Sequence, residues 1–101
     1  MKITIQPSAL SDLRDGYHFY ETRESGLGDD FLNAIYSDID SLHRYAGIHS
    51  IHFTRFHRLL SKRFPYGIYY QLFGSTVSVF AILDLRRDPK WIASKLSGQN
   101  P

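Results

Sequence analysis

The chain has 101 residues, of which 43% are apolar and 22% charged, and it contains no cysteine. These values predict one soluble globular domain, spanning residues 1–96, and exclude disulfides, thiolate chemistry and cysteine-based metal sites. No apolar run reaches the roughly 20 residues that a membrane span needs, and residues 1–5 lack the apolar core of a signal peptide. We therefore expect a cytoplasmic protein that binds no membrane and no cofactor.

The two halves of the chain differ in charge. Residues 1–50 carry four basic and eight acidic side chains, whereas residues 51–101 carry eight basic and two acidic ones. No Asp or Glu occurs between Asp40 and Asp84. This polarity predicts a basic face and an acidic or polyanionic partner, although a solvated sheet face would show the same pattern.

The first half predicts a strand followed by a helical hairpin. Residues 2–6 have the pattern of a short strand. The next segment has Ser8 as a candidate N-cap and apolar residues at helical spacing, namely Leu10, Leu13, Tyr17 and Tyr20. After Gly26 and Gly28, Asp29 can cap a second helix with an apolar face of Phe31, Ile35, Ile39 and Leu42.

The second half predicts three strands and a short helix. Residues 51–60, 64–73 and 77–85 are rich in aromatic and β-branched side chains, with Gly74 and Ser75 suited to a hairpin turn. Asp88 and Pro89 predict the start of a terminal helix, and residues 97–101 are expected to be frayed. The expected fold class is α+β, with the helical hairpin on one face of an antiparallel four-stranded sheet.

Both faces of the last two predicted strands are apolar. A sheet with one solvated face should show polar residues at alternate positions, and these strands do not. Two apolar faces require two covers, and we interpret the second cover as another protein or, alternatively, the chain's own terminal helix and loops. The residues expected to contact such a partner are Tyr66, Ile68, Tyr70, Phe80 and Ile82.

Several motifs resemble those of the RelE/ParE toxin superfamily. The segment from Phe56 to Tyr70 resembles an arginine-bearing strand followed by a Phe-Pro-Tyr-x-Ile-x-Tyr strand. The segment from Arg86 to Trp91 resembles the Arg-Arg-Asp-Pro-x-x-Trp ending of the superfamily, and the Gly-Leu-Gly-Asp-x-Phe segment from Gly26 resembles the opening of its second helix. The resemblance covers nearly the whole chain in the same order and is closer to ParE than to RelE.

The resemblance implies a β-α-α-β-β-β fold and the toxin of a type II toxin–antitoxin, or plasmid stabilisation, system. Such a toxin arrests growth when free and is neutralised by a cognate small acidic antitoxin. ParE-like members inhibit DNA gyrase, whereas RelE-like members cleave messenger RNA on the ribosome. An inactive member that only binds an antitoxin is a third alternative.

A ribonuclease needs a general base, a general acid and cations around the phosphate. The candidates here are His57, Arg58, Lys62 and Arg87. By the family pattern, the strand arginine of RelE-type toxins falls at Gly67, no tyrosine follows Tyr70, and residues 41–83 offer no glutamate base. These departures favour a ParE-like binding protein over an enzyme.

For a binding protein, basic and aromatic side chains of the second half are the expected target contacts. They are Arg58, Lys62, Arg63, Arg86, Arg87 and Trp91. Two of them have simpler structural interpretations, because Trp91 can pack the terminal helix and Arg86 can pair with Asp84.

A metal site is not predicted. If residues 49–57 formed one extended strand, His49 and His57 would lie roughly 26 Å apart. His52 would then point to the other face, so the three histidines would not share a metal.

Overall fold

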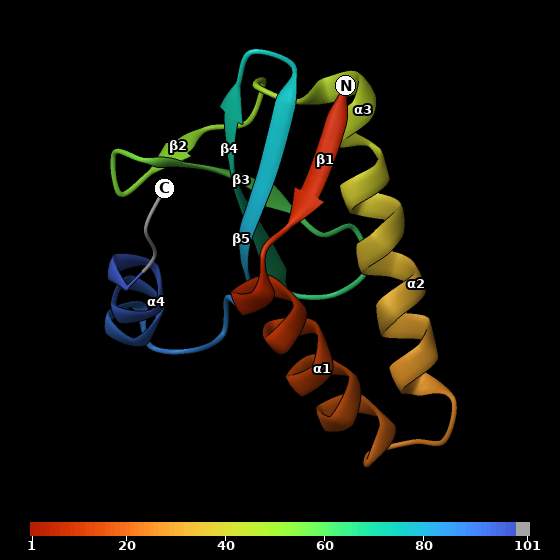
Figure 1. Ribbon diagram of the computed structural model, residues 1–101. Coiled ribbons are helices and arrows are strands. Elements are labelled where there is room, and N and C mark those ends of the chain that lie inside the picture. The colour runs from red at the N-terminus through yellow and green to blue at the C-terminus, as the bar shows by residue number, and fades with distance from the viewer. Residues whose placement is uncertain (99–101) are drawn as a thin grey trace.

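The computed structural model describes residues 1–98, in which helices lie on both faces of one sheet (Figure 1). The strands are β1 (Lys2–Ile5), β2 (Ile51–His52), β3 (Phe56–Leu60), β4 (Tyr66–Phe73) and β5 (Thr76–Asp84). The helices are α1 (Pro7–Glu21), α2 (Leu27–Asp40), α3 (Leu42–Tyr45) and α4 (Pro89–Ser97). Ser97, expected to be frayed, is the last residue of α4, while residues 99–101 lie outside the described part of the chain.

The predicted helical hairpin is confirmed, but its caps differ from those expected. Gln6 is the N-cap of α1, and Ser8 instead donates its hydroxyl to the carbonyl oxygen of Phe80 at 2.6 Å. Gly26, with a φ of 89°, is the N-cap of α2 in place of Asp29. The Glu21 carboxylate accepts hydrogen bonds from the backbone N–H groups of Gly26 and Gly28, so it satisfies donors that the start of a helix leaves free.

The sheet has five strands in the order β1-β5-β4-β3-β2, and β1 runs parallel to β5. The expected four-stranded antiparallel sheet is wrong in these two details, although the α+β class is confirmed. Residues 51–60 are not one strand, because Phe53 and Thr54 adopt positive φ angles of 55° and 60° and turn the chain between β2 and β3. The predicted β4–β5 hairpin is present, with Gly74 at a φ of 58° in its turn.

The main core lies between the sheet and the α1–α2 hairpin. It contains the helix residues Leu13, Tyr20, Phe31 and Ile35 and the strand residues Tyr66, Ile68, Tyr70, Val79 and Ile82. The ring of Phe31 stacks against Tyr20 at 5.2 Å and meets Tyr66 edge-on at 4.9 Å between centroids. This aromatic packing fixes the hairpin on the sheet.

A second core lies on the opposite face, under α4. Ile92 and Leu96 of α4 pack there with Phe56, Tyr69, Phe80 and Leu83, and all six are buried. The second apolar face is therefore covered by the chain's own terminal helix, which is one of the two covers considered above, and not by a separate polypeptide.

Helix α1 also completes the edge of β5 beyond the end of β1. The backbone N–H of Gln6 donates to Val79, the Ser8 hydroxyl donates to Phe80, and the Asp12 carboxylate accepts from the backbone N–H of Ile82 at 2.9 Å. Side chains one helical turn apart thus replace strand pairing along this edge. This arrangement places a carboxylate at the junction of α1, β5 and α4.

Candidate functional site

Two of the predicted cations, Arg58 and Arg87, line one cavity on the α4 side of the sheet. The cavity has a volume of about 200 Å³. Its other walls are His52, Phe53, Tyr69, Leu85, Pro89 and Ile92, so it contains no carboxylate. The arrangement is a small, basic and largely apolar pocket, which we call the Arg58–Arg87 pocket.

Arg58 comes from β3, opposite Tyr69 of β4. Its aliphatic stem lies over Gly67, where an added Cβ would come within 3.2 Å of both Cγ and Cδ of Arg58. The Nε of Arg58 is buried and has no hydrogen-bond partner within the described residues. Burial and the nearby Arg58 charge lower the pKa of His52, which keeps that ring neutral around pH 7.

Arg87 enters the pocket from the segment between β5 and α4. Its guanidinium lies 4.0 Å from the ring centroid of Trp91, a cation–π contact. Trp91 itself packs against the second core, so its predicted packing role is correct. The same tryptophan therefore anchors α4 and orients Arg87.

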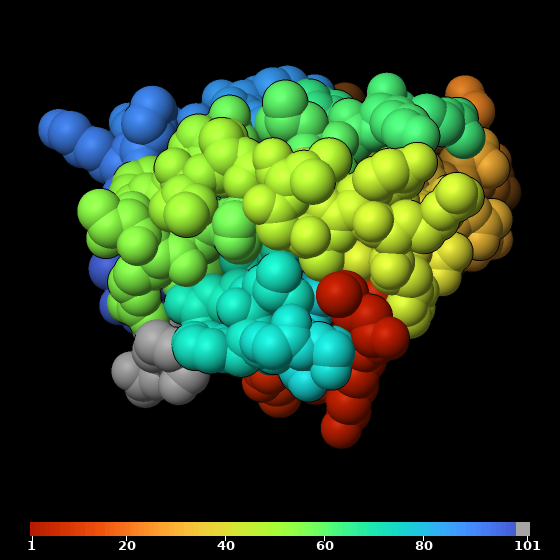
Figure 2. Space-filling view, turned by 90° about the horizontal axis from the view of Figure 1, so that it is seen from above, coloured from red at the N-terminus to blue at the C-terminus, as the bar shows by residue number. Residues whose placement is uncertain are grey.

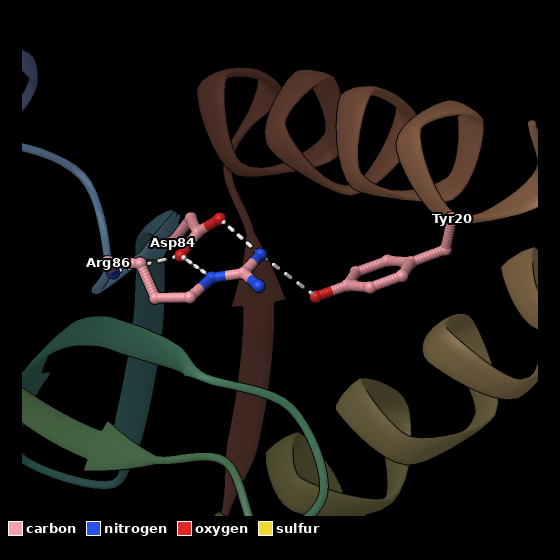
Figure 3. A network of polar contacts seen from close by, with 3 residues as sticks. All are labelled: Tyr20, Asp84 and Arg86. Atoms are coloured by element: carbon pink, nitrogen blue, oxygen red, sulfur yellow. Dashed lines mark hydrogen bonds and ion pairs between the residues drawn. The ribbon is translucent and has the colours of Figure 1, made fainter. Parts of the chain in front are cut away.

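Arg86 takes part in a network of its own (Figure 3). Its guanidinium binds the Asp84 carboxylate at 2.8 Å and reaches the hydroxyl of Tyr20 at 3.4 Å. Burial acts to raise the pKa of Asp84, but the hydrogen bonds and charge of Arg86 outweigh it and lower that pKa below its ordinary value. The ion pair considered from the sequence is confirmed, and it neutralises Arg86 beside the aromatic core.

The other two predicted cations lie outside the pocket. Lys62 and Arg63 are exposed in the segment between β3 and β4, and the Arg63 guanidinium lies 5.5 Å from the Phe64 ring centroid. Neither Lys62 nor Arg63 lines the Arg58–Arg87 pocket. Among the predicted contacts in the described part of the chain, Arg58 and Arg87 share this pocket, and Arg87 lines a second cavity together with Trp91, Asp12 and Asp84.

His57 lies on the opposite face from Arg58. Its ring stacks on Tyr70 at 5.0 Å between centroids, in the layer that faces the helical hairpin. Its Nδ1 donates to the backbone oxygen of His49 at 2.7 Å, and the His49 ring hydrogen-bonds the Tyr70 hydroxyl. The predicted nuclease candidates are thus divided between two faces of the sheet.

The expected distance between His49 and His57 is also wrong. The β2–β3 turn folds the chain back, so that both rings contact Tyr70 instead of lying on an extended strand. Even so, within residues 1–98 the His, Asp and Glu side chains form no group of three that could hold a metal ion.

The five residues expected to contact an antitoxin are buried. Tyr66, Ile68, Tyr70 and Ile82 belong to the main core, and Phe80 belongs to the second core, with exposures between 0 and 6%. A partner cannot reach these side chains in this conformation, because α1, α2 and α4 already cover them.

Exposed apolar side chains occur elsewhere. Leu10 and Tyr36, each 44% exposed, line a groove on the outer side of the hairpin. The remaining groove residues are Leu13, Arg14, Tyr17 and Leu32. Figure 2 shows that the segment after α3 lies beside the β4–β5 turn. Ile48 and Ile51 are exposed in the stretch that follows α3, and Phe73 is exposed at the end of β4.

One titratable group was missed by the sequence analysis. Asp12, on α1, lines a cavity between α1, β5 and α4, where its carboxylate lies 4.0 Å from the Lys95 ammonium. Burial raises the pKa of Asp12 to about 6, and the Ile82 hydrogen bond and Lys95 oppose this only in part. In the sequence, the one indication that Asp12 is buried was its position next to Leu13, in the apolar stripe of α1.

Comparisons with known proteins identify the fold. No protein-family model and no curated protein matches the chain. Among solved structures, it is similar to a chain of "Chromosomal ParDE TA system from P. aeruginosa", with a TM-score of 0.71 and 16% identity. The match covers 84% of this chain and 96% of that one, so the predicted RelE/ParE-like fold is confirmed. Within residues 1–98, no helix is long and apolar enough to cross a bilayer.

Proposed function

We propose that this chain is the toxin of a type II toxin–antitoxin system, with residues 1–96 as its single, cytoplasmic toxin domain. In this proposal it is ParE-like, inhibits DNA gyrase, arrests growth when free and is neutralised by a small acidic antitoxin. The observation that carries the proposal is the fold shared with a chain of a ParDE toxin–antitoxin system.

The arrangement of the candidate residues favours a binding protein over an mRNA endoribonuclease. A nuclease needs its base near the cations that hold the phosphate, and His57 lies on the opposite sheet face from Arg58. At residue 67, where the family pattern places the strand arginine of RelE-type toxins, this chain has a glycine, and the stem of Arg58 fills the space above it. Arg58, Arg87 and Trp91 are then contact residues for the target, while Arg86 supports the core.

The groove between α1 and α2 is the surface proposed for the antitoxin. It replaces the five sheet residues expected from the sequence, which are buried. Its apolar residues follow two antiparallel helices, so an amphipathic helix of the antitoxin can place apolar anchors between them.

The test is induced expression together with a supercoiling assay on purified gyrase. We expect growth arrest and loss of supercoiling, with translated transcripts left intact. Arg87→Ala should weaken both effects without unfolding the protein, whereas Arg44→Ala, at an exposed site on α3 that is not among the predicted contacts, serves as the matched control. Cleaved transcripts with unaffected gyrase would instead identify a RelE-like ribonuclease, and unaffected growth would refute the toxin proposal.

A further inference from the structure

Two basic side chains, Arg58 and Arg87, line the Arg58–Arg87 pocket. Arg87 also lines the neighbouring cavity that contains Asp12 and Asp84, and its charge helps to lower the pKa of Asp84. Arg86 pairs with Asp84, and Lys95 lies 4.0 Å from Asp12. Within residues 1–98, by contrast, no carboxylate oxygen lies within 4.0 Å of a side-chain nitrogen of Arg58 or Arg87. The pocket that these two arginines share has no carboxylate in its walls. Two arginines in the wall of one cavity that no carboxylate lines favour an anionic ligand.

The buried Nε of Arg58 strengthens this argument. A buried donor on a charged group that lacks an acceptor costs more free energy than an ordinary missing hydrogen bond. Arg58 is held in place because its stem lies over Gly67 and its backbone belongs to β3. A ligand that supplies negative charge beside this guanidinium would offset the cost.

Both guanidinium groups are positioned before any ligand arrives. Arg87 rests on the Trp91 ring, and Trp91 packs on the second core. Because the side chains are already ordered, binding loses little rotamer freedom. A planar carboxylate can then accept two parallel N–H bonds from either arginine.

The walls indicate what carries the anion. Phe53, Tyr69, Leu85, Pro89 and Ile92 form an apolar surround, and Phe53 is 48% exposed at the rim. Single-stranded nucleic acids bind basic grooves by stacking their bases on exposed aromatic rings, but Tyr69 is only 1% exposed, so Phe53 is the one phenyl or phenol ring of these walls that bases could reach. A peptide with an acidic side chain between apolar neighbours matches both the charge and the walls.

We propose that the Arg58–Arg87 pocket anchors a protein partner through one Asp or Glu side chain flanked by apolar residues. This inference rests on the proposed function, because it names the chemistry by which the target of the proposed toxin is recognised. It predicts that the acidic side chain becomes desolvated on binding and contributes strongly to affinity.

The experiment uses the full chain and three probes. Acetyl-Leu-Glu-Leu-amide, its Gln counterpart and the dinucleotide uridylyl-uridine are titrated while the arginine Nε–H signals are followed by NMR. The acidic peptide should shift the signals of Arg58 and Arg87, and the Gln peptide should not. Arg87→Gln should lower the affinity of the acidic peptide about ten-fold or more.

The control variant is Arg44→Gln, which removes an exposed arginine of α3 that is not among the predicted contacts and should leave peptide affinity unchanged. Thermal melting of each variant verifies that it is folded. Equal binding of both peptides, binding of neither, or tighter binding of the dinucleotide would overturn the inference. Growth that continues while peptide binding is intact would refute only the proposed toxin function, and growth arrest without peptide binding would refute only the anchor.

Discussion

Asp12 should make the protein less stable at neutral pH than in mild acid. Its side chain is only 10% exposed, and burial raises its pKa from 3.8 to about 6. The neighbouring charges are Lys95 on α4, which opposes the rise, and Asp15 on α1, which adds to it. Between pH 3.8 and about 6 the unfolded chain releases this proton while the folded chain keeps it, so the free energy of unfolding falls as pH rises.

The magnitude follows from the size of the shift. A difference of about two pKa units corresponds to about 3 kcal/mol at pH 7, a large share of the stability of a small domain. Asp12→Asn keeps an oxygen that can accept from Ile82 but carries no charge, so it imitates the protonated acid. We therefore expect the variant to be more stable than the parent at pH 7 by up to about 3 kcal/mol.

Urea unfolding between pH 4.5 and 8 measures this effect. The stability difference between Asp12→Asn and the parent should widen by about 2 kcal/mol over that range, all in favour of the variant. Glu24→Gln, an exposed carboxylate between α1 and α2 that does not contribute to the Asp12 shift, is the matched control and should show only a small, flat difference. A variant that is less stable than the parent at pH 7, or a difference that narrows with pH, would refute the reasoning.

Two further predictions concern packing and the ion pair of Arg86. Gly16→Ala should lower the free energy of unfolding by about 1–3 kcal/mol, because the added Cβ would lie 2.5 Å from Cζ of the buried Phe31 ring. Urea unfolding should show a smaller loss of stability when the same substitution is made in a Phe31→Leu variant. Equal losses in the two backgrounds would contradict the steric explanation. Arg86→Gln should lower stability at pH 7 by about 0.5–1 kcal/mol, since the pair is partly exposed. Because the pKa of Asp84 is lowered in the fold, that loss should shrink as acid protonates Asp84, and a loss independent of pH would exclude the ion pair as its cause.

The sequence predicted features that depend on neighbours along the chain. The stripe that includes Leu13 and Tyr20 predicted α1, and the adjacent Asp84 and Arg86 predicted their ion pair. The sequence did not predict the features that depend on contacts between distant segments. The parallel pairing of β1 with β5 has no local pattern, and Phe53 at positive φ is not a residue type that marks a turn.

The candidate site shows the same division. Basic residue types were found from composition, but only the fold shows that Arg58 and Arg87 share a cavity while His57 points to the other face. Arg58 reaches its position because the neighbouring strand has a glycine at residue 67. Such cross-strand compensation depends on strand register, which a single sequence does not specify.

The pairing of the first strand with the last has a consequence for how a newly made chain matures. Ile3 and Ile5 find their partners only at Val77 and Val79, near the other end of the described chain. Until β5 has been synthesised, β1 cannot join the β3–β4 pair, so the hairpin helices lack the central part of the sheet that covers their apolar residues. The nascent chain should therefore pass through a long, protease-sensitive interval before any of its surfaces can recognise a partner.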